Sequence, residues 1–141
     1  MRIERSIQDG HLGEHIALAP VATAASRARR FVRRVGSSWA IDELAEAAIL
    51  LTNELVTNAI VHARTPIDLR LELRGSRLRI AARDQDPRPV RPRAENRQAE
   101  RSRGLLIVAR AARAWGVDDH PGGGKVVWCT LDVPEAPPVP A

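Results

Sequence analysis

The chain lacks tyrosine, has one phenylalanine and three tryptophans, and contains a single cysteine, Cys129, among its 141 residues. A lone cysteine excludes an internal disulfide and any zinc site built from several cysteines. The four histidines show no metal-ligand spacing. No run of 18 apolar residues occurs, and the N-terminus lacks the apolar core of a signal peptide. We therefore expect a soluble cytoplasmic protein whose core is built from alanine, leucine, isoleucine and valine.

Positive charge exceeds negative charge, and almost all of it comes from arginine. The 22 basic residues include a single lysine, Lys125, and the formal net charge is +5. This balance is compatible with nucleic acid, nucleotide phosphates or an acidic protein as partners. The arginines are dispersed along the chain, and no basic stretch interleaved with aromatic residues offers a base-stacking surface. Composition therefore argues against nucleic acid and favours a nucleotide or an acidic protein.

Hydrophobic periodicity predicts a single α+β domain at residues 14–133, between an N-terminal arm (1–13) and a proline-rich tail (134–141). Its predicted elements are, in order, an edge strand at 14–19, a helix at 21–35 ended by Gly36, a helix capped by Asp42 that runs to about His62, hairpin strands at 67–73 and 78–82, a loop at 85–103, a helix from Gly104, and strands near 116–118 and 125–133. Helices on one face of a mixed, mostly antiparallel sheet make a two-layer α/β sandwich. A loop of about twenty residues inside a compact domain suggests a lid or a binding element.

The helix predicted at 42–62 carries a carboxylate and a carboxamide one turn apart, at Glu54 and Asn58. Residues four apart on a helix project from the same face. An apolar stripe that includes Leu51 and Leu55 should face the sheet, so the stripe of Glu54 and Asn58 should border a cleft. A carboxylate that accepts a proton and an amide oxygen that binds a hard cation suit phosphate chemistry. The alternative is a surface helix with two solvated polar residues.

The pattern Glu54-x-x-x-Asn58-Ala59, followed by His62-Ala63, resembles the N-box of the GHKL ATPase superfamily. More narrowly, the chain resembles the small bacterial anti-sigma factor serine kinases, which carry a histidine-kinase-like ATP-binding domain of the Bergerat type. The resemblance implies ATP and Mg²⁺ as cofactors, Glu54 as the catalytic base and Asn58 as the residue that holds magnesium against the phosphates. It also implies a sigma factor or a STAS-type anti-sigma antagonist as partner, and a homodimer.

Asp84, directly after the second hairpin strand, matches the family position whose carboxylate accepts a hydrogen bond from the adenine amino group. A carboxylate suits adenine because it offers only lone pairs, whereas guanine presents a carbonyl at the equivalent edge. The usual Asp-x-Gly-x-Gly is here Asp84-Gln85-Asp86-Pro87-Arg88, without either glycine. A turn at the end of a strand would also explain an aspartate here.

Two further segments contribute to the resemblance. Ser102–Val108 is similar to the second glycine box, in which the N–H groups of a helix that starts at Gly104 and Leu105 would bind phosphate, assisted by Arg103. An ordinary helix start is the alternative. The run Gly122–Lys125 is not a P-loop, because Val126 and a predicted strand follow the lysine. We expect a hairpin turn there and keep Lys125 as a candidate phosphate contact.

Two functions remain open at this point. One is a serine/threonine kinase that phosphorylates an anti-sigma antagonist, with the loop at 85–103 closing as a lid. The other is an ATP-binding switch that holds a sigma factor or antagonist without phosphoryl transfer, which the missing glycines after Asp84 favour. A nucleic-acid binder would rest on charge alone.

Overall fold

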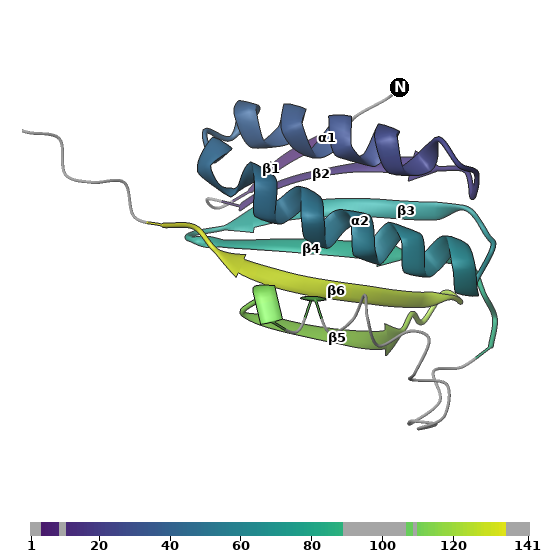
Figure 1. The fold of residues 1–141 in the computed structure, drawn as a ribbon. Coiled ribbons are helices and arrows are strands. Elements are labelled where there is room, and N and C mark those ends of the chain that lie inside the picture. Colours follow the sequence, from purple (N-terminus) through teal and green to yellow (C-terminus); the bar gives the residue numbers. More distant parts are fainter. Residues whose placement is uncertain (1–3, 9–10, 89–106, 109, 135–141) are drawn as a thin grey trace, which may run out of the picture.

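The computed structural model describes residues 4–8 (backbone only), 11–88, 107–108 and 110–134. It shows one six-stranded sheet, in the order β1-β2-β3-β4-β6-β5, with two helices on one face (Figure 1). The elements are β1 (Glu4–Gln8), β2 (His11–Leu18), α1 (Ala24–Ser38), a 3-10 turn η1 (Asp42–Leu44), α2 (Ala45–His62), β3 (Ile67–Arg74), β4 (Arg77–Arg83), β5 (Ala114–Asp119) and β6 (Lys125–Asp132).

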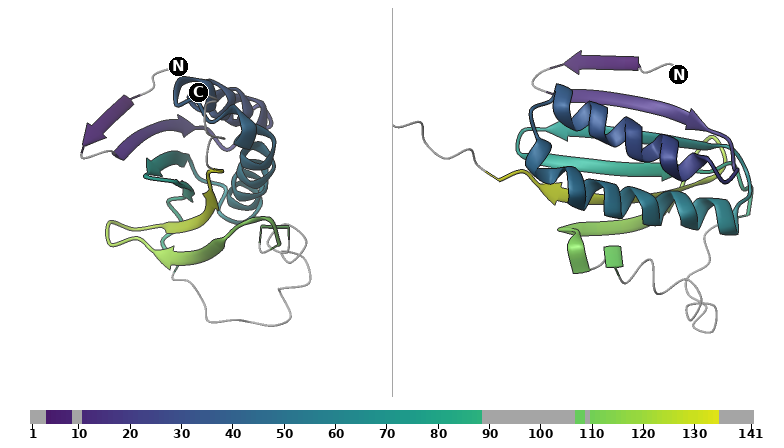
Figure 2. Two further views of the ribbon diagram at one scale, coloured as in Figure 1. Left: turned by 90° about the vertical axis from the view of Figure 1, so that its left-hand side faces the viewer. Right: turned by 45° about the horizontal axis from the view of Figure 1, so that its top comes forward.

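The predicted two-layer α+β sandwich is confirmed, and further views show both helices on the same side of the sheet (Figure 2). All five strand pairings among the described residues are antiparallel, so the parallel component of the expected mixed sheet is not found in them. The predicted hairpin is confirmed as β3 and β4, which are joined at Gly75 with a φ of 60°. The strands predicted at 116–118 and 125–133 are confirmed as β5 and β6.

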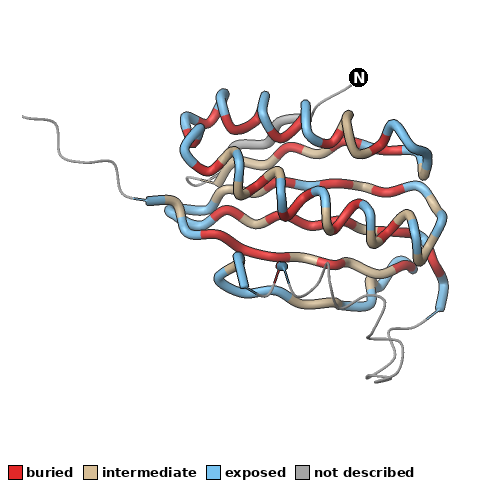
Figure 3. The backbone as a smooth tube through the Cα atoms, viewed as in Figure 1, coloured by how far each residue is buried: buried red, intermediate tan, exposed pale blue. Residues whose placement is uncertain are grey.

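The core lies between the helices and the sheet (Figure 3). Successive strand residues point to opposite faces, and the burial of Leu69, Leu71 and Ile80 shows which face meets the helices. The stripe expected to face the sheet, which runs from the end of η1 along α2, is buried throughout, at Leu44, Ala48, Leu51, Leu55 and Ala59. Within the described residues, the segment Asp42–His62 is long and apolar enough to cross a membrane, but here one side of it packs in the core of the domain.

The opposite face of the sheet is polar. His15 Nδ1 lies 3.0 Å from Asp68 Oδ1, and His11 Nε2 lies 3.0 Å from Glu72 Oε2. The guanidinium of Arg79 stacks over the Trp128 ring at 5.6 Å. Antiparallel sheets commonly combine one solvated face with one packed face, and this sheet does so.

Three local predictions were wrong. The strand expected at the sheet edge, β2, is interior because β1 pairs with its outer side, and residues assigned to the N-terminal arm thus belong to the sheet. Helix α1 runs through Gly36 to Ser38 and ends where Ala40 adopts a φ of 57°. Asp42 is not the cap of the helix, because it is the first residue of η1 and Leu44 precedes α2 as its N-cap residue.

The loop expected at 85–103 and the start of the helix expected from Gly104 lie largely outside the described residues. Residues 107–108 and 110–111 are helical, and Val108 is fully buried against the core. Cys129 is also buried, and burial raises the pKa of its thiol to about 12. The thiol is therefore a packed core group rather than a nucleophile.

Candidate functional site

Asp84 lies at the end of β4 and is buried, with 3 % of its surface exposed. The alternation along β4, in which Ile80 and Ala82 face the helices, directs Asp84 to the same side. Its Oδ1 accepts two backbone hydrogen bonds, from the N–H of Asp86 at 2.9 Å and from the N–H of Lys125 at 3.1 Å. The backbone N–H of Asp84 donates to the Lys125 carbonyl at 2.9 Å. The carboxylate is therefore fixed by the ends of two neighbouring strands.

Lys125 begins β6 and places its ammonium between two carboxylates. Its Nζ lies 3.2 Å from Asp84 Oδ2 and donates a hydrogen bond to Asp86 Oδ2 at 3.3 Å. The side chains of the two aspartates are 4 % and 6 % exposed, and that of Lys125 is 17 % exposed. A buried carboxylate needs such a partner because desolvation otherwise disfavours its charge.

Asp86 and Arg88 occupy the positions where the family pattern has glycines. The guanidinium of Arg88 donates to Asp86 Oδ1 through Nε at 2.9 Å and to Oδ2 through Nη2 at 2.6 Å, and its backbone N–H donates to Oδ1 at 3.0 Å. These hydrogen bonds hold the pKa of the Asp86 carboxyl well below its usual range, and Asp86 raises the pKa of Arg88. Two successive turns, each closed by an aspartate side chain, therefore shape residues 84–88.

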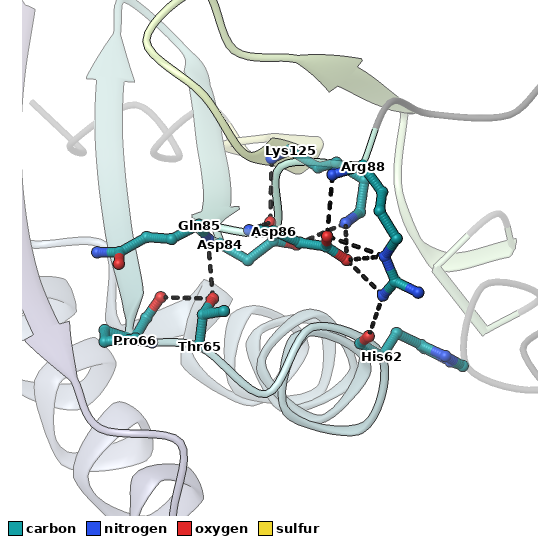
Figure 4. A network of polar contacts seen from close by, with 8 residues as sticks. All are labelled: His62, Thr65, Pro66, Asp84, Gln85, Asp86, Arg88 and Lys125. Atoms are coloured by element: carbon teal, nitrogen blue, oxygen red, sulfur yellow. Dashed lines mark hydrogen bonds and ion pairs between the residues drawn. The ribbon is translucent and has the colours of Figure 1, made fainter.

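The same segment is joined to the C-terminal end of α2 (Figure 4). Arg88 Nη2 donates to the carbonyl of His62, the last residue of the helix, at 3.2 Å. The backbone N–H of Gln85 donates to Thr65 Oγ1 at 2.8 Å. The Asp84 segment and the helix end that follows Asn58 by one turn are thus held at the same end of the molecule.

Gly124 allows the turn before β6 to approach β4 closely. It has a φ of +91°, and a Cβ built on it would lie 2.0 Å from the backbone oxygen of Asp84. Gly123 also has a positive φ, of +99°, but nothing lies within 4 Å of its Cβ position. Position 124 therefore requires glycine both for its positive φ and for the close approach to the Asp84 backbone, whereas position 123 requires it for the positive φ alone.

Glu54 and Asn58 are both half-buried on α2, beside the stripe that packs on the sheet. A hollow of about 290 Å³ lies between α1 and α2, and its lining includes Arg29, Thr52 and Asn53 but none of the predicted site residues. Arg103, Gly104 and Leu105, the predicted phosphate-binding residues, lie outside the described residues. The roles of all these residues stay predictions, and the structure brings Asp84 and Lys125 into direct contact.

The fold and the position of Asp84 agree with one family of domains. The family model for the histidine kinase-like ATPase domain matches residues 18–131, which is well over half of the chain. The chain belongs to this family. No significant match is found among curated proteins. Membership in this family supports ATP as the ligand of the domain.

The oxygen donors of this histidine kinase-like ATPase domain fit a magnesium ion that arrives with a nucleotide. No cluster of three or more histidine, cysteine or acidic side chains that could hold a metal occurs in the part of the chain that the structure describes. Mg²⁺ commonly binds through one or two protein oxygens together with substrate phosphates and water. The half-buried Asn58 carboxamide carries an oxygen of this kind, and its role as a magnesium ligand stays a prediction.

The sequence did not predict that Asp86, Arg88 and Thr65 form the hydrogen bonds that hold the Asp84 segment in place. The sequence showed that both glycines are replaced, but no contact was assigned to the residues in their place. The spacing Asp84-x-Asp86-x-Arg88 carried a usable signal, because aspartate side chains accept hydrogen bonds from backbone N–H groups two residues on. The link from Arg88 to His62 joins residues 26 positions apart, and no local pattern predicts it.

Proposed function

We propose that this histidine kinase-like ATPase domain is a Mg-ATP-dependent serine/threonine protein kinase. In this proposal it acts as an anti-sigma factor and phosphorylates a STAS-type anti-sigma antagonist in the cytoplasm. The observation that carries the proposal is the pair Glu54 and Asn58, half-buried and one turn apart on α2. Glu54 is not needed to bind a purine, so a carboxylate beside the proposed cation-binding amide favours phosphoryl transfer over nucleotide binding alone.

Each residue has one task in this proposal. Glu54 accepts the proton of the attacking serine or threonine hydroxyl, a contribution typically of about 10²–10⁴-fold in rate. Asn58 would hold Mg²⁺, which when bound would offset the charge of the transferring group. Asp84 accepts from the base, and Arg103, Gly104 and Leu105, where the sequence predicts a helix start, bind phosphate.

Calorimetry of Mg-ATP binding tests the nucleotide half of the proposal. The wild-type chain should bind, and Asp84→Asn should weaken binding because the amide nitrogen brings a donor to a position that requires an acceptor. Circular dichroism has to show that the variant is folded. Failure of the folded wild-type chain to bind Mg-ATP would remove the basis of the proposal.

Phosphoryl transfer to a purified STAS-type antagonist tests the chemical half. Glu54→Gln should lower the single-turnover rate by about 10²–10⁴-fold and leave Mg-ATP affinity nearly unchanged. Glu43→Gln, the same change at an exposed residue of η1, is the matched control and should transfer at the wild-type rate. Equal rates for Glu54→Gln and the wild type would exclude Glu54 as the base.

The second candidate is an ATP-binding switch that holds a sigma factor or antagonist without phosphoryl transfer. The bridge from Asp86 through Arg88 to His62 favours it, because a segment held by side-chain hydrogen bonds is less adaptable than one with glycines. The single-turnover assay distinguishes the two candidates. A switch leaves the antagonist unmodified even when Mg-ATP binds with wild-type affinity.

A further inference from the structure

Lys125 is the only lysine of the chain, and its contacts place it beside the predicted base-binding carboxylate rather than in a basic cluster. Asp84, Asp86, Lys125 and Arg88 form a group of two anions and two cations, joined by the contacts drawn in Figure 4. The group is neutral overall, so the ammonium has no surplus charge to offer a triphosphate. To reach phosphate, Nζ would have to leave two buried carboxylates without their cation, which is unfavourable.

The hydrogen-bonding capacity of the group is nearly filled. A carboxylate has about four lone-pair positions on its two oxygens. Oδ1 of Asp84 uses both of its positions on backbone N–H groups, and Oδ2 faces the ammonium of Lys125. Asp86 is occupied by Arg88 and Lys125. Among the described residues, one acceptor position on Asp84 Oδ2 and at least one N–H of Lys125 therefore remain for a ligand.

This remaining donor and acceptor change the basis of purine selection. A carboxylate alone accepts from the amino group of adenine and repels the carbonyl oxygen of a 6-oxopurine, since both oxygens carry only lone pairs. With Lys125 beside it, the carbonyl oxygen of guanine or hypoxanthine can accept from the ammonium while the ring N1–H donates to Asp84. Adenine in the same orientation, shifted by one ring position, can still donate its amino group to Asp84 and accept from the ammonium at ring N7.

We propose that Lys125 contacts the base and opens the site to 6-oxopurine nucleotides as well as to adenine nucleotides. This inference rests on the proposed nucleotide binding and deepens it, since it names the class of base that the site accepts. The Lys125 side chain is 17 % exposed, more than either carboxylate that it contacts.

Calorimetry of the full chain with the magnesium complexes of ATP, GTP, ITP and CTP tests the proposal. The affinities for ATP, GTP and ITP should agree within about tenfold. CTP should bind at least tenfold more weakly, because the single ring of a pyrimidine places its polar edge closer to the ribose than a purine does. Lys125→Met keeps the length of the side chain and removes its charge. This variant should lose GTP and ITP affinity by at least tenfold more than ATP affinity. Lys125→Arg should retain binding of the 6-oxopurines.

The wild-type ratio tests the inference even if the Lys125 variants do not fold. Tight ATP binding with GTP more than a hundredfold weaker would overturn the role of Lys125 and leave the proposed kinase intact. Equal binding of CTP, or an equal loss for every nucleotide in folded Lys125→Met, would show that the ammonium does not read the base. Failure of all four nucleotides to bind the folded wild-type chain would overturn the proposed function itself.

Discussion

At the scale of single residues, Asp86 links stability to pH. Its carboxyl pKa is lowered by Arg88 from the usual 3.8, so below about pH 4 the unfolded chain takes up a proton that folded Asp86 does not. The stability that Asp86 contributes is thus present above that pH and is lost as the pH falls toward the lowered value. Asp86→Asn should cost about 1.5–3 kcal/mol at pH 7, because hydrogen bonds to a charged group are lost.

Urea unfolding at pH 7 and at pH 3 measures this difference. The gap between wild type and Asp86→Asn should narrow at the lower pH. Asp42→Asn, at an exposed aspartate, is the control and should follow the wild type at both values. A gap that is equal at both pH values would show that the carboxyl of Asp86 is not held ionised by Arg88.

Gly124 and Gly123 make a matched pair at the turn before β6. Both have positive φ, so alanine at either position should cost about 1–3 kcal/mol in backbone strain. Only at Gly124 does the new Cβ meet the Asp84 carbonyl, so Gly124→Ala should be destabilised further and should also lose nucleotide affinity. Thermal unfolding and calorimetry measure the two effects. Similar values for both variants would contradict the close approach of the turn to Asp84.

The predicted site residues differ in how much of their surroundings a local sequence pattern can predict. Asp84 is found because it directly follows an alternating strand, and the structure buries it there. The contacts of Lys125 are not found, since a lysine after three glycines has no local feature that points to a carboxylate 41 positions away. The contact of Arg88 with Asp86 joins residues close in sequence, whereas its contact with His62 depends on the tertiary fold.

At the scale of elements, a substitution at Gly36 tests where α1 ends, since the sequence predicted that the helix stops at this glycine. It lies within α1, with no positive φ and nothing within 4 Å of its Cβ position. Gly36→Ala should therefore stabilise the protein by about 0.5–1 kcal/mol, as expected from helix propensity. Gly75→Ala is the matched control, because its Cβ position is also open but its φ is +60°. Chemical unfolding should show opposite signs for the two variants.

Elements were predictable where one periodicity spans a whole segment, as in β3 and β4. The ends of helices and strands were less predictable. The end of α1, for example, depends on the burial of Trp39 and Ile41 in the core rather than on Gly36. The interior position of β2 depends on pairing with β1, whose sequence ERSIQ has no apolar alternation of its own. Such tertiary effects override local preference.

At the scale of the whole molecule, the helix layer and the sheet enclose a single hydrophobic core that runs from α1 to β6. A ligand that binds at the end of β4 touches a segment joined both to β6 and to α2. Binding energy at this segment should therefore stabilise the whole domain rather than one hairpin, because the core connects all of these elements.

Mg-ATP at a hundredfold excess over its dissociation constant should stabilise the wild-type chain by about 2.7 kcal/mol. Tryptophan fluorescence, to which the buried Trp39 at the far end of α1 from the site contributes, should report the shift in thermal unfolding because the domain unfolds as one unit. Glu54→Gln should keep the shift, since the proposed base acts only in transfer, and Asp84→Asn should lose most of it. A shift of equal size in Asp84→Asn would place the nucleotide somewhere other than at the end of β4.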